Sequence, residues 1–174
     1  MNIEIRTATV DDAEEILAIY SPYVKNTAIS FEYEPPSIEE FRERIRKTLE
    51  SFPYLVAVSD GEIIGYTYAG KFHPRAAFLH SAELSIYLRQ DMRGKGIGKI
   101  LYTEIERILK TKGIINLYAL VAYADEEDNY ISHDSVIFHE VMGYKTVGKC
   151  KKCGYKFDRW YDMLFMEKFI GSHK

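Results

Sequence analysis

A short, cationic and glycine-rich segment is the part of the sequence whose residue types and spacing most clearly support chemistry. It reads Leu88-Arg89-Gln90-Asp91-Met92-Arg93-Gly94-Lys95-Gly96-Ile97-Gly98-Lys99. Alternating glycines allow the backbone to turn its N–H groups toward one point, and a helix that starts there adds partial positive charge. Four basic side chains outweigh one acidic side chain, so the segment is locally positive in a chain whose net charge is −3. This pattern predicts a cradle for a pyrophosphate.

Two common phosphate-binding motifs do not fit this segment. A P-loop requires Gly-Lys followed by Ser or Thr, whereas Gly94-Lys95 is followed by Gly96. The dinucleotide-binding fingerprint requires a small residue where Lys99 stands and an N-terminal βαβ unit, which the sequence lacks. A flexible basic loop that caps a helix is the remaining alternative.

The second candidate for chemistry is Glu83, in the middle of a strand expected over residues 80–88. Side chains alternate along a strand, so Glu83 shares its side with Ser85 and Tyr87, and the apolar residues between them point the other way. A carboxylate there is costly unless it is solvated or functional. In a cleft it can take a proton from an ammonium group, directly or through water, and so release a nucleophilic amine. The alternative is an exposed glutamate paired with a neighbouring cation.

The two cysteines, Cys150 and Cys153, predict neither a metal site nor a redox site. A structural zinc site needs four ligands, and the sequence offers no second cysteine pair and no histidines at a matching spacing. A redox pair normally opens a helix in a thioredoxin-like βαβ unit, which is missing. We expect two reduced thiols near a turn and no bound metal.

Alternating and helical patterns of apolar residues predict the elements that position these candidates. Strands are expected over residues 3–8, 54–59, 62–69, 80–88 and 115–123, with two more over 144–168 around a loop at 153–158. Helices are expected after capping residues at 9–12 and 37–40, after Gly98 as far as Gly113, and from Asp134 or Ser135 to Met142, with Pro22 disturbing the end of the first. Asp60-Gly61 marks a two-residue hairpin turn. The order β-α-α-β-β-β-α-β-α-β-β predicts a mixed α+β fold, with a mostly antiparallel sheet flanked by helices.

Length and composition are those of an ordinary globular protein. The 174 residues suit one domain, expected to span 1–174, and 47% are hydrophobic while 28% are charged. The 23 basic and 26 acidic residues argue against a generally basic nucleic-acid binder. No apolar run approaches the roughly 20 residues of a membrane span, and the first residues lack the pattern of a signal peptide. We expect a cytoplasmic protein with no nucleic-acid or membrane partner.

The glycine-rich segment contains Arg93-x-x-Gly96-x-Gly98, which resembles the acyl-CoA pyrophosphate motif of the GNAT N-acetyltransferase superfamily. The predicted order of elements is also that of the superfamily. Further stretches extend the resemblance over nearly the whole chain, to the phosphinothricin and methionine sulfoximine or sulfone N-acetyltransferases: residues 30–35, 66–70, 83–88, 138–144 and 154–163. The resemblance implies the GNAT acyl-CoA N-acyltransferase fold and acetyl-CoA as the acyl donor.

The resemblance assigns catalytic and cofactor-binding roles. The glutamate matching Glu83 is the family's general base, and the aromatic residue matching Tyr144 can donate to the departing CoA thiolate or simply pack at a helix end. The family's cofactor-contacting asparagine is replaced by Ser132, with Asn129 as the alternative if the loop folds differently. Strand backbone at 86–88 is implied to pair with pantetheine. The residues expected to bind acetyl-CoA are Ile86, Tyr87, Leu88, Arg93, Gly94, Lys95, Gly96, Ile97, Gly98, Lys99, Ser132 and Asn129.

The resemblance also implies an acceptor pocket. The residues that match its positions are Phe31, Phe72, His73, Arg75, Glu83, Ser85 and Trp160. Arg75 can pair with a carboxylate or phosphinate of the acceptor, or it can be a loop arginine in solvent. His73 is alternatively a surface residue, and His139 is expected to pack within a helix. The acidic run 125–128 is expected to be a solvated loop, with attraction of a cationic amine as the alternative.

These features together predict an enzyme that transfers the acetyl group of acetyl-CoA to a small amino-acid-like amine, by direct attack in a ternary complex. One alternative is the same fold acting on a polyamine, an aminoglycoside or a protein N-terminus. The other is a non-catalytic acyl-CoA-binding sensor. The resemblance implies a homodimer.

Overall fold

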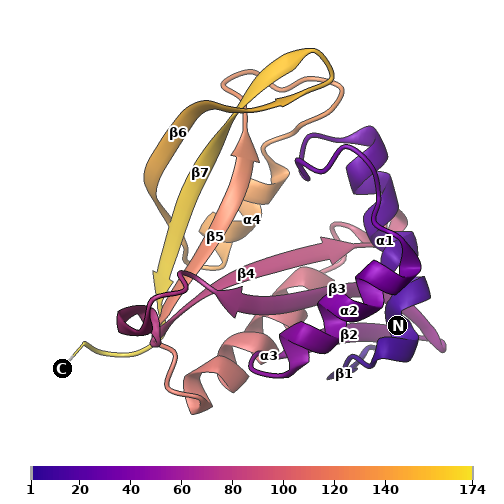
Figure 1. The fold of residues 1–174 in the computed structure, drawn as a ribbon, viewed down its shortest axis with the longest axis vertical. Helices are drawn as coiled ribbons and strands as arrows, with labels where there is room; N and C mark the ends of the chain where they lie inside the picture. The colour runs from indigo at the N-terminus through magenta and orange to yellow at the C-terminus, as the bar shows by residue number, and fades with distance from the viewer. Residues whose placement is uncertain (1, 174) are drawn as a thin grey trace.

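The computed structural model of the chain describes residues 2–173, which contain one seven-stranded sheet (Figure 1). The strands are β1 (Glu4–Thr7), β2 (Tyr54–Ser59), β3 (Glu62–Lys71), β4 (Ser81–Leu88), β5 (Asn116–Tyr123), β6 (Lys145–Lys156) and β7 (Arg159–Phe169). Their order across the sheet is β1-β2-β3-β4-β5-β7-β6, and every pair is antiparallel except β4 with β5. The predicted mixed α+β class is confirmed.

The structure also contains four α-helices, α1 (Ala13–Asn26), α2 (Ile38–Leu49), α3 (Ile97–Thr111) and α4 (Asp134–Val141), and three 3₁₀-helices, η1 (Val10–Asp12), η2 (Ala76–Phe78) and η3 (Gln90–Met92). Local sequence signals set several of their limits. The Ser37 hydroxyl accepts the Glu40 N–H at 3.2 Å at the start of α2. Asp60 and Gly61 both have positive φ, 52° and 83°, as a tight hairpin turn requires. Gly113, with a φ of 80°, follows the end of α3.

The helices cover the two faces of the sheet. On one face, α1 and α2 pack against β2 and β3 in a core that includes Ile16, Ile45 and Tyr66. On the other face, α3 buries Leu101 and Ile105 against β2, β3 and β4 in a second core. Tyr87 packs against the first core, whereas Leu84, Ile86 and Leu88 belong to the second, so the predicted alternation along β4 is confirmed.

The parallel strands β4 and β5 pair over only three residues each. Ser81, Ala82 and Glu83 lie opposite residues 116–118, and beyond Glu83 the strands diverge, as Figure 1 shows. β5 then pairs with β7 along its whole length, and the β6–β7 hairpin follows it away from the rest of the sheet. The divergence leaves the edge of β4 that faces β5 without a partner strand over residues 84–88.

Three expected boundaries differ from the structure. α1 continues past Pro22 to Asn26, because the buried Tyr23 and Val24 hold its last turn against the sheet. His133 precedes α4 without capping it, and Asp134 and Ser135 lie in its first turn. β6 and β7 meet at a two-residue turn, Phe157-Asp158, in which both residues have positive φ, so Cys153 lies within β6 and not in a loop. No helix within residues 2–173 is both long and apolar enough to cross a membrane.

Candidate functional site

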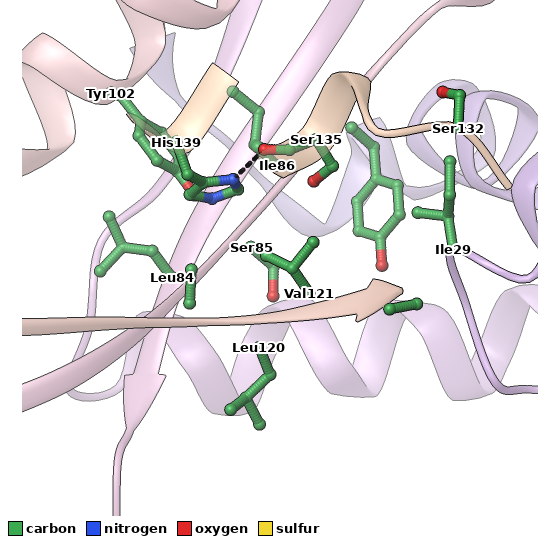
Figure 2. A pocket seen from close by; sticks show the side chains of 13 residues that line it. Ile29, Leu84, Ser85, Ile86, Tyr102, Leu120, Val121, Ser132, Ser135 and His139 are labelled. Atoms are coloured by element: carbon green, nitrogen blue, oxygen red, sulfur yellow. Dashed lines mark hydrogen bonds between the residues drawn. The ribbon is translucent and has the colours of Figure 1, made fainter. Parts of the chain in front are cut away.

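A cavity of about 50 Å³ lies where β4 and β5 diverge (Figure 2). Both strands, α3, α4 and the segment after α1 contribute to its walls. The lining residues are Ile29, Leu84, Ser85, Ile86, Tyr87, Tyr102, Ala119, Leu120, Val121, Ala122, Ser132, Ser135 and His139. Because the strands do not pair across this gap, a narrow extended molecule can lie along β4 as an added strand would.

A larger groove of about 460 Å³ adjoins the cavity and shares Ile29, Ile86 and Ser135 with it. Its other lining residues are Tyr23, Leu88, Arg93, Gly94, Gly98, Asp134, Ile137, Phe138 and Val141. The side chains of Ile137 and Val141 are 55% and 76% exposed, an uncovered apolar wall on α4. The groove is therefore apolar along α4 and cationic where Arg93 lies.

The N-terminus of α3 closes the cationic end of this groove. Gly94 and Gly96 have φ values of 72° and 81°, and a Cβ built on either would meet nothing within 4 Å. Within residues 2–173, no backbone carbonyl accepts a hydrogen bond from the N–H groups of residues 94–99. These free donors, the helix terminus and Arg93 form a donor set suited to an anion with several oxygens, such as the pyrophosphate of an acyl-CoA.

Gly98 lines the groove and also has a packing role that the sequence alone does not predict. It lies inside α3, and a Cβ at this position would be 2.9 Å from the ring of Phe138 and 3.5 Å from Ile86. The missing side chain therefore allows α4 to approach α3 closely, which sets the width of the groove. Lys95 and Lys99 flank the segment, with Lys95 Nζ 3.5 Å from Met92 Sδ, and neither lines the groove.

Glu83 lies beside open space at the last paired position of β4 and β5. Its neighbours in the sheet are Gly70 on β3 and Tyr118 on β5. A Cβ on Gly70 would meet nothing within 4 Å, so the space next to the Glu83 side chain is open on that side. Burial alone raises the pKa of Glu83 above its usual value, and no charged neighbour offsets that shift. A half-buried carboxylate of this kind is suited to accept a proton.

Tyr144 does not face this space, so the structure favours the packing alternative over the predicted role as an acid. Its side chain is buried in the core under α3, and its hydroxyl donates to Glu106 at 3.2 Å. Lys168 binds the other Glu106 oxygen at 2.6 Å and completes the network. Tyr144 lines neither cavity. A Gly-aromatic pair marks where a helix ends, but it does not determine the side to which the aromatic ring turns.

His139 and Tyr102 occupy the cavity wall on that side instead. The His139 Nδ1 lies 2.6 Å from the Ser135 carbonyl (Figure 2), which requires an Nδ1–H donor. Nε2 therefore accepts from the Tyr102 hydroxyl at 2.9 Å. Burial lowers the pKa of His139 to about 4, and the imidazole is neutral at physiological pH. The expectation that His139 packs within a helix holds, but the residue also lines the cavity. The sequence does not single out Tyr102 as a cavity residue, because it lies among the apolar, core-facing residues of its helix.

The residues expected to bind the acceptor are split between two locations. Phe72 stacks on Tyr118, next to Glu83, with ring centroids 3.9 Å apart. Phe31 packs in a small core with Ala122, which lines the cavity, and Ser85 lines the cavity itself. His73 and Arg75 are exposed on the segment between β3 and β4 and line neither space described above.

Trp160 is not in the pocket of its own chain, contrary to expectation. The residue is 56% exposed, and its indole ring lies beside Tyr155, with ring centroids 4.9 Å apart. The next residue, Tyr161, is fully buried, and because side chains alternate along β7, Trp160 must point outward. Sequence alone does not say which of the two aromatic residues takes the inner face.

The loop between β5 and α4 is solvated at residues 125–127, as expected, but Asp128 fastens it to the β6–β7 hairpin. Asp128 accepts two backbone N–H bonds, from Tyr130 and Ile131, and also binds Arg159 at 2.7 Å. Lys149 joins Asp125 to Asp162 in the same region. In this arrangement Ser132 lines the cavity, whereas Asn129 is exposed.

Both cysteines are free and exposed. Residues 2–173 contain no group of three or more His, Cys, Asp or Glu side chains placed to hold a metal ion.

Comparison with known proteins identifies relatives over almost the whole chain. Residues 5–165 match the acetyltransferase (GNAT) domain family. The L-methionine sulfoximine/L-methionine sulfone acetyltransferase of Pseudomonas aeruginosa is 37% identical over 174 residues, covering 96% of this chain and 94% of that protein.

Two solved structures are similar at the level of both fold and sequence. The GNAT phosphinothricin acetyltransferase of Sinorhizobium meliloti, in complex with acetyl-CoA, superposes with a TM-score of 0.89 at 33% identity, covering 98% of this chain and 90% of that one. The ribosomal-protein-alanine N-acetyltransferase of Brucella melitensis gives a TM-score of 0.87 at 33% identity, covering 96% and 99%.

Proposed function

The chain belongs to the GNAT family of acetyltransferases, and from that premise we propose how its residues bind two substrates and move a proton. The enzyme is an N-acetyltransferase that transfers the acetyl group of acetyl-CoA to the amine of an amino-acid-like acceptor. The observation that carries this assignment is the gap between β4 and β5, which runs into the groove that ends at the free N–H groups before α3.

The acetyl-CoA site follows from this geometry. The N–H groups of residues 94–99 and the Arg93 guanidinium would bind the pyrophosphate, and Lys95 and Lys99 would add positive charge at its edge. The apolar wall of α4 and the unpaired edge of β4 at 86–88 would hold the extended arm, with Ser132 at the side of the cavity. When bound, acetyl-CoA supplies the thioester whose carbonyl carbon the amine attacks, and whose C–S bond breaks as CoA leaves as a thiolate.

Glu83 is the proposed general base. An acceptor amine arrives as an ammonium ion and must lose a proton before it can attack. The half-buried carboxylate, whose pKa burial raises, takes that proton directly or through one water. The open space beside Gly70 admits the acceptor, and the stacked Phe72 and Tyr118 rings form its apolar side.

The proposed acceptor is a small α-amino acid analogue of the phosphinothricin, methionine sulfoximine or methionine sulfone type. The fastening of the β5–α4 loop to the hairpin, through Arg159 and Asp128, supports a small acceptor because it walls this side of the cleft. Arg75 is an exposed cation on the segment next to Phe72 and is available to the acceptor's anionic group. A protein N-terminus is the second candidate, supported by the likeness to the Brucella enzyme.

Mass spectrometry of products from acetyl-CoA and an amine panel tests this proposal. The panel contains the three analogues, spermidine, an aminoglycoside and a peptide with N-terminal alanine. Acetylated analogues are expected, and Arg75→Ala should raise KM for them about 10-fold, since a charge-assisted hydrogen bond contributes about 1.5–3 kcal/mol. Faster turnover of the peptide or the polyamine than of every analogue would overturn the acceptor class.

We also propose that residues 1–174 form one domain, that two copies associate as a homodimer, and that the enzyme is cytoplasmic. Continuity of the seven-stranded sheet supports the first statement. The exposed aromatic side chains of Tyr155 and Trp160 support the second, because such surfaces are often covered by a partner. The free thiols of Cys150 and Cys153 support a reducing compartment.

A further inference from the structure

Lys156, the last residue of β6, is a buried cation that contacts no carboxylate of residues 2–173. The residue is 3% exposed. Its Nζ donates to three backbone carbonyls: Val24 at 2.6 Å, Thr27 at 2.8 Å and Ser30 at 2.7 Å. An ammonium group has three N–H donors, so these bonds use its full capacity. Lys156 thus joins the end of β6 to the end of α1 and to the segment that follows α1.

The acceptors explain why a lysine is buried there. Val24 is in the last turn of α1, where carbonyl groups lack helical partners and carry partial negative charge. Thr27 Oγ1 donates to the Tyr23 carbonyl at 2.7 Å, so Lys156 and Thr27 together satisfy two of these carbonyls. Burial lowers the pKa of Lys156, and the charge of Glu32 opposes that shift.

The segment that Lys156 holds carries residues of the proposed active site. Ile29 lines both the cavity and the groove. Phe31 packs directly on the hairpin: a Cβ built on Gly154 would be 2.6 Å from its ring. The Ala28 N–H donates to the Tyr130 carbonyl at 2.9 Å, which joins the same segment to the β5–α4 loop.

We propose that Lys156 is a positioning residue for the acceptor site, whose ammonium group fixes residues 27–31 so that Phe31 forms one wall of that site. This assignment rests on the proposed function, with Phe31 at the acceptor position that the family resemblance gives it and packed beside Ala122 of the cavity wall. The acetyl-CoA site draws most of its contacts from α3, β4 and α4, which Lys156 does not touch. Loss of the ammonium group should therefore weaken the binding of the acceptor far more than the binding of acetyl-CoA.

The test compares Lys156→Met with two controls at a temperature at which all are folded. Methionine keeps most of the apolar stem and removes the three donors. Lys151→Met changes an exposed lysine of the same strand. Ile105→Val weakens the core under α3 without touching the hairpin, and it shows what a general loss of stability does. The measurements are KM and kcat for the best analogue of the panel and the Kd of acetyl-CoA by calorimetry.

In Lys156→Met we expect an acceptor KM at least 10-fold above wild type and an acetyl-CoA Kd within about 3-fold of it. Both controls should keep the wild-type acceptor KM. Gly154→Ala, which pushes the Phe31 ring from the other side, should raise the acceptor KM while Lys156 is intact. In the double variant with Lys156→Met, Gly154→Ala should raise the acceptor KM by a smaller factor than it does alone. The reason is that both changes displace the same wall.

An unchanged acceptor KM in folded Lys156→Met, an equal rise in Ile105→Val, or full additivity with Gly154→Ala would each overturn the assignment. Should the methionine variant not fold, Lys156→Arg is read instead. Its planar guanidinium keeps the charge but cannot bring three donors from one nitrogen to these carbonyls, and a wild-type acceptor KM in that variant also overturns the assignment. Failure of the proposed function is distinct, because the wild-type enzyme would then acetylate none of the analogues.

Discussion

The Arg93 guanidinium donates to the Asp134 carboxylate at 2.8 Å, and both residues line the larger groove. This pair links the glycine-rich segment before α3 to the first turn of α4. A pyrophosphate that binds Arg93 must compete with the carboxylate for the same donor. Asp134 is therefore placed to weaken the affinity for acetyl-CoA.

Replacement of Asp134 by Asn should tighten acetyl-CoA binding. Exposed ion pairs are worth about 0.2–1 kcal/mol, so the expected gain is about 1.4- to 5-fold in Kd, measured by calorimetry at low salt. Arg93→Gln should weaken binding, and in that background Asp134→Asn should change Kd far less. A Kd that rises in Asp134→Asn would contradict the competition.

Glu83→Gln should lower kcat/KM by about 10²–10⁴-fold at neutral pH, the usual effect of losing a general base. The base acts when ionised, and burial raises its pKa, so the wild-type rate should rise with pH through a value above that of an ordinary glutamate. The variant should lose this limb and recover partly at high pH, where the acceptor is already a free amine. Glu39→Gln, on the exposed side of α2, is the matched control.

The same substitution should also stabilise the fold at neutral pH. A carboxyl group whose pKa is raised on folding contributes most stability when protonated, and that contribution is lost as pH rises through the folded-state pKa. The Tm of Glu83→Gln should therefore exceed that of wild type at pH 7–8, and the difference should shrink toward pH 4. A lower Tm at pH 8 would show that the carboxylate has a stabilising partner.

Tyr144→Phe should leave kcat within about 2-fold of wild type. Its hydroxyl bonds Glu106 in the core under α3, so the change removes one hydrogen bond, worth about 1 kcal/mol of stability. Tyr102→Phe removes the hydroxyl that donates to His139 in the cavity wall and should lower kcat more. Steady-state kinetics at one pH compares the two variants, and a larger loss in Tyr144→Phe would restore the role expected from the sequence.

The free energy of unfolding should fall as pH drops below about 6.5. Burial lowers the pKa of His139 to about 4, so the unfolded chain binds a proton in this range that the folded chain excludes. The loss reaches about 3 kcal/mol at pH 4 if His139 acts alone. Denaturant titrations from pH 4 to 7 should show this slope in His73→Gln, which changes an exposed histidine, and a smaller slope in His139→Phe.

Gly98→Ala should destabilise the fold by about 1–3 kcal/mol, because the added methyl group meets the Phe138 ring at 2.9 Å. Phe138→Leu should recover part of that loss, since it removes the ring atoms nearest Gly98. Thermal unfolding of the two single variants and the double variant measures the coupling. Additive losses would show that the helices separate freely at this point.

Local chemistry made much of the fold predictable. Ser37, Asp60-Gly61 and Gly113 act through their own backbone and nearest neighbours, and the structure places each as expected. The period-two pattern of β4 correctly separated Glu83 from Leu84. The glycine-rich segment was also placed correctly, because a strand end, a turn and a helix start are all visible in the sequence.

The remaining errors concern choices that only tertiary packing makes. The directions of Tyr144 and Trp160 depend on which face of a short element the core accepts. The sequence places Gly98 in a phosphate-binding motif. A side chain is excluded there by the ring of Phe138, which lies 40 residues further along the chain. Lys156 ends a largely exposed strand and precedes the turn formed by Phe157 and Asp158. Only its contacts with the end of α1 show why it is buried.

A strand edge at the surface of a protein recruits other chains, and that is how many β proteins aggregate. The unpaired stretch of β4 is an edge of this kind, but it lies in the middle of the sheet, with β5 and α4 on its open side. A second polypeptide strand would have to displace those elements to reach it. The protein can thus keep unpaired backbone N–H and C=O groups available to its narrow ligand without self-associating through this edge.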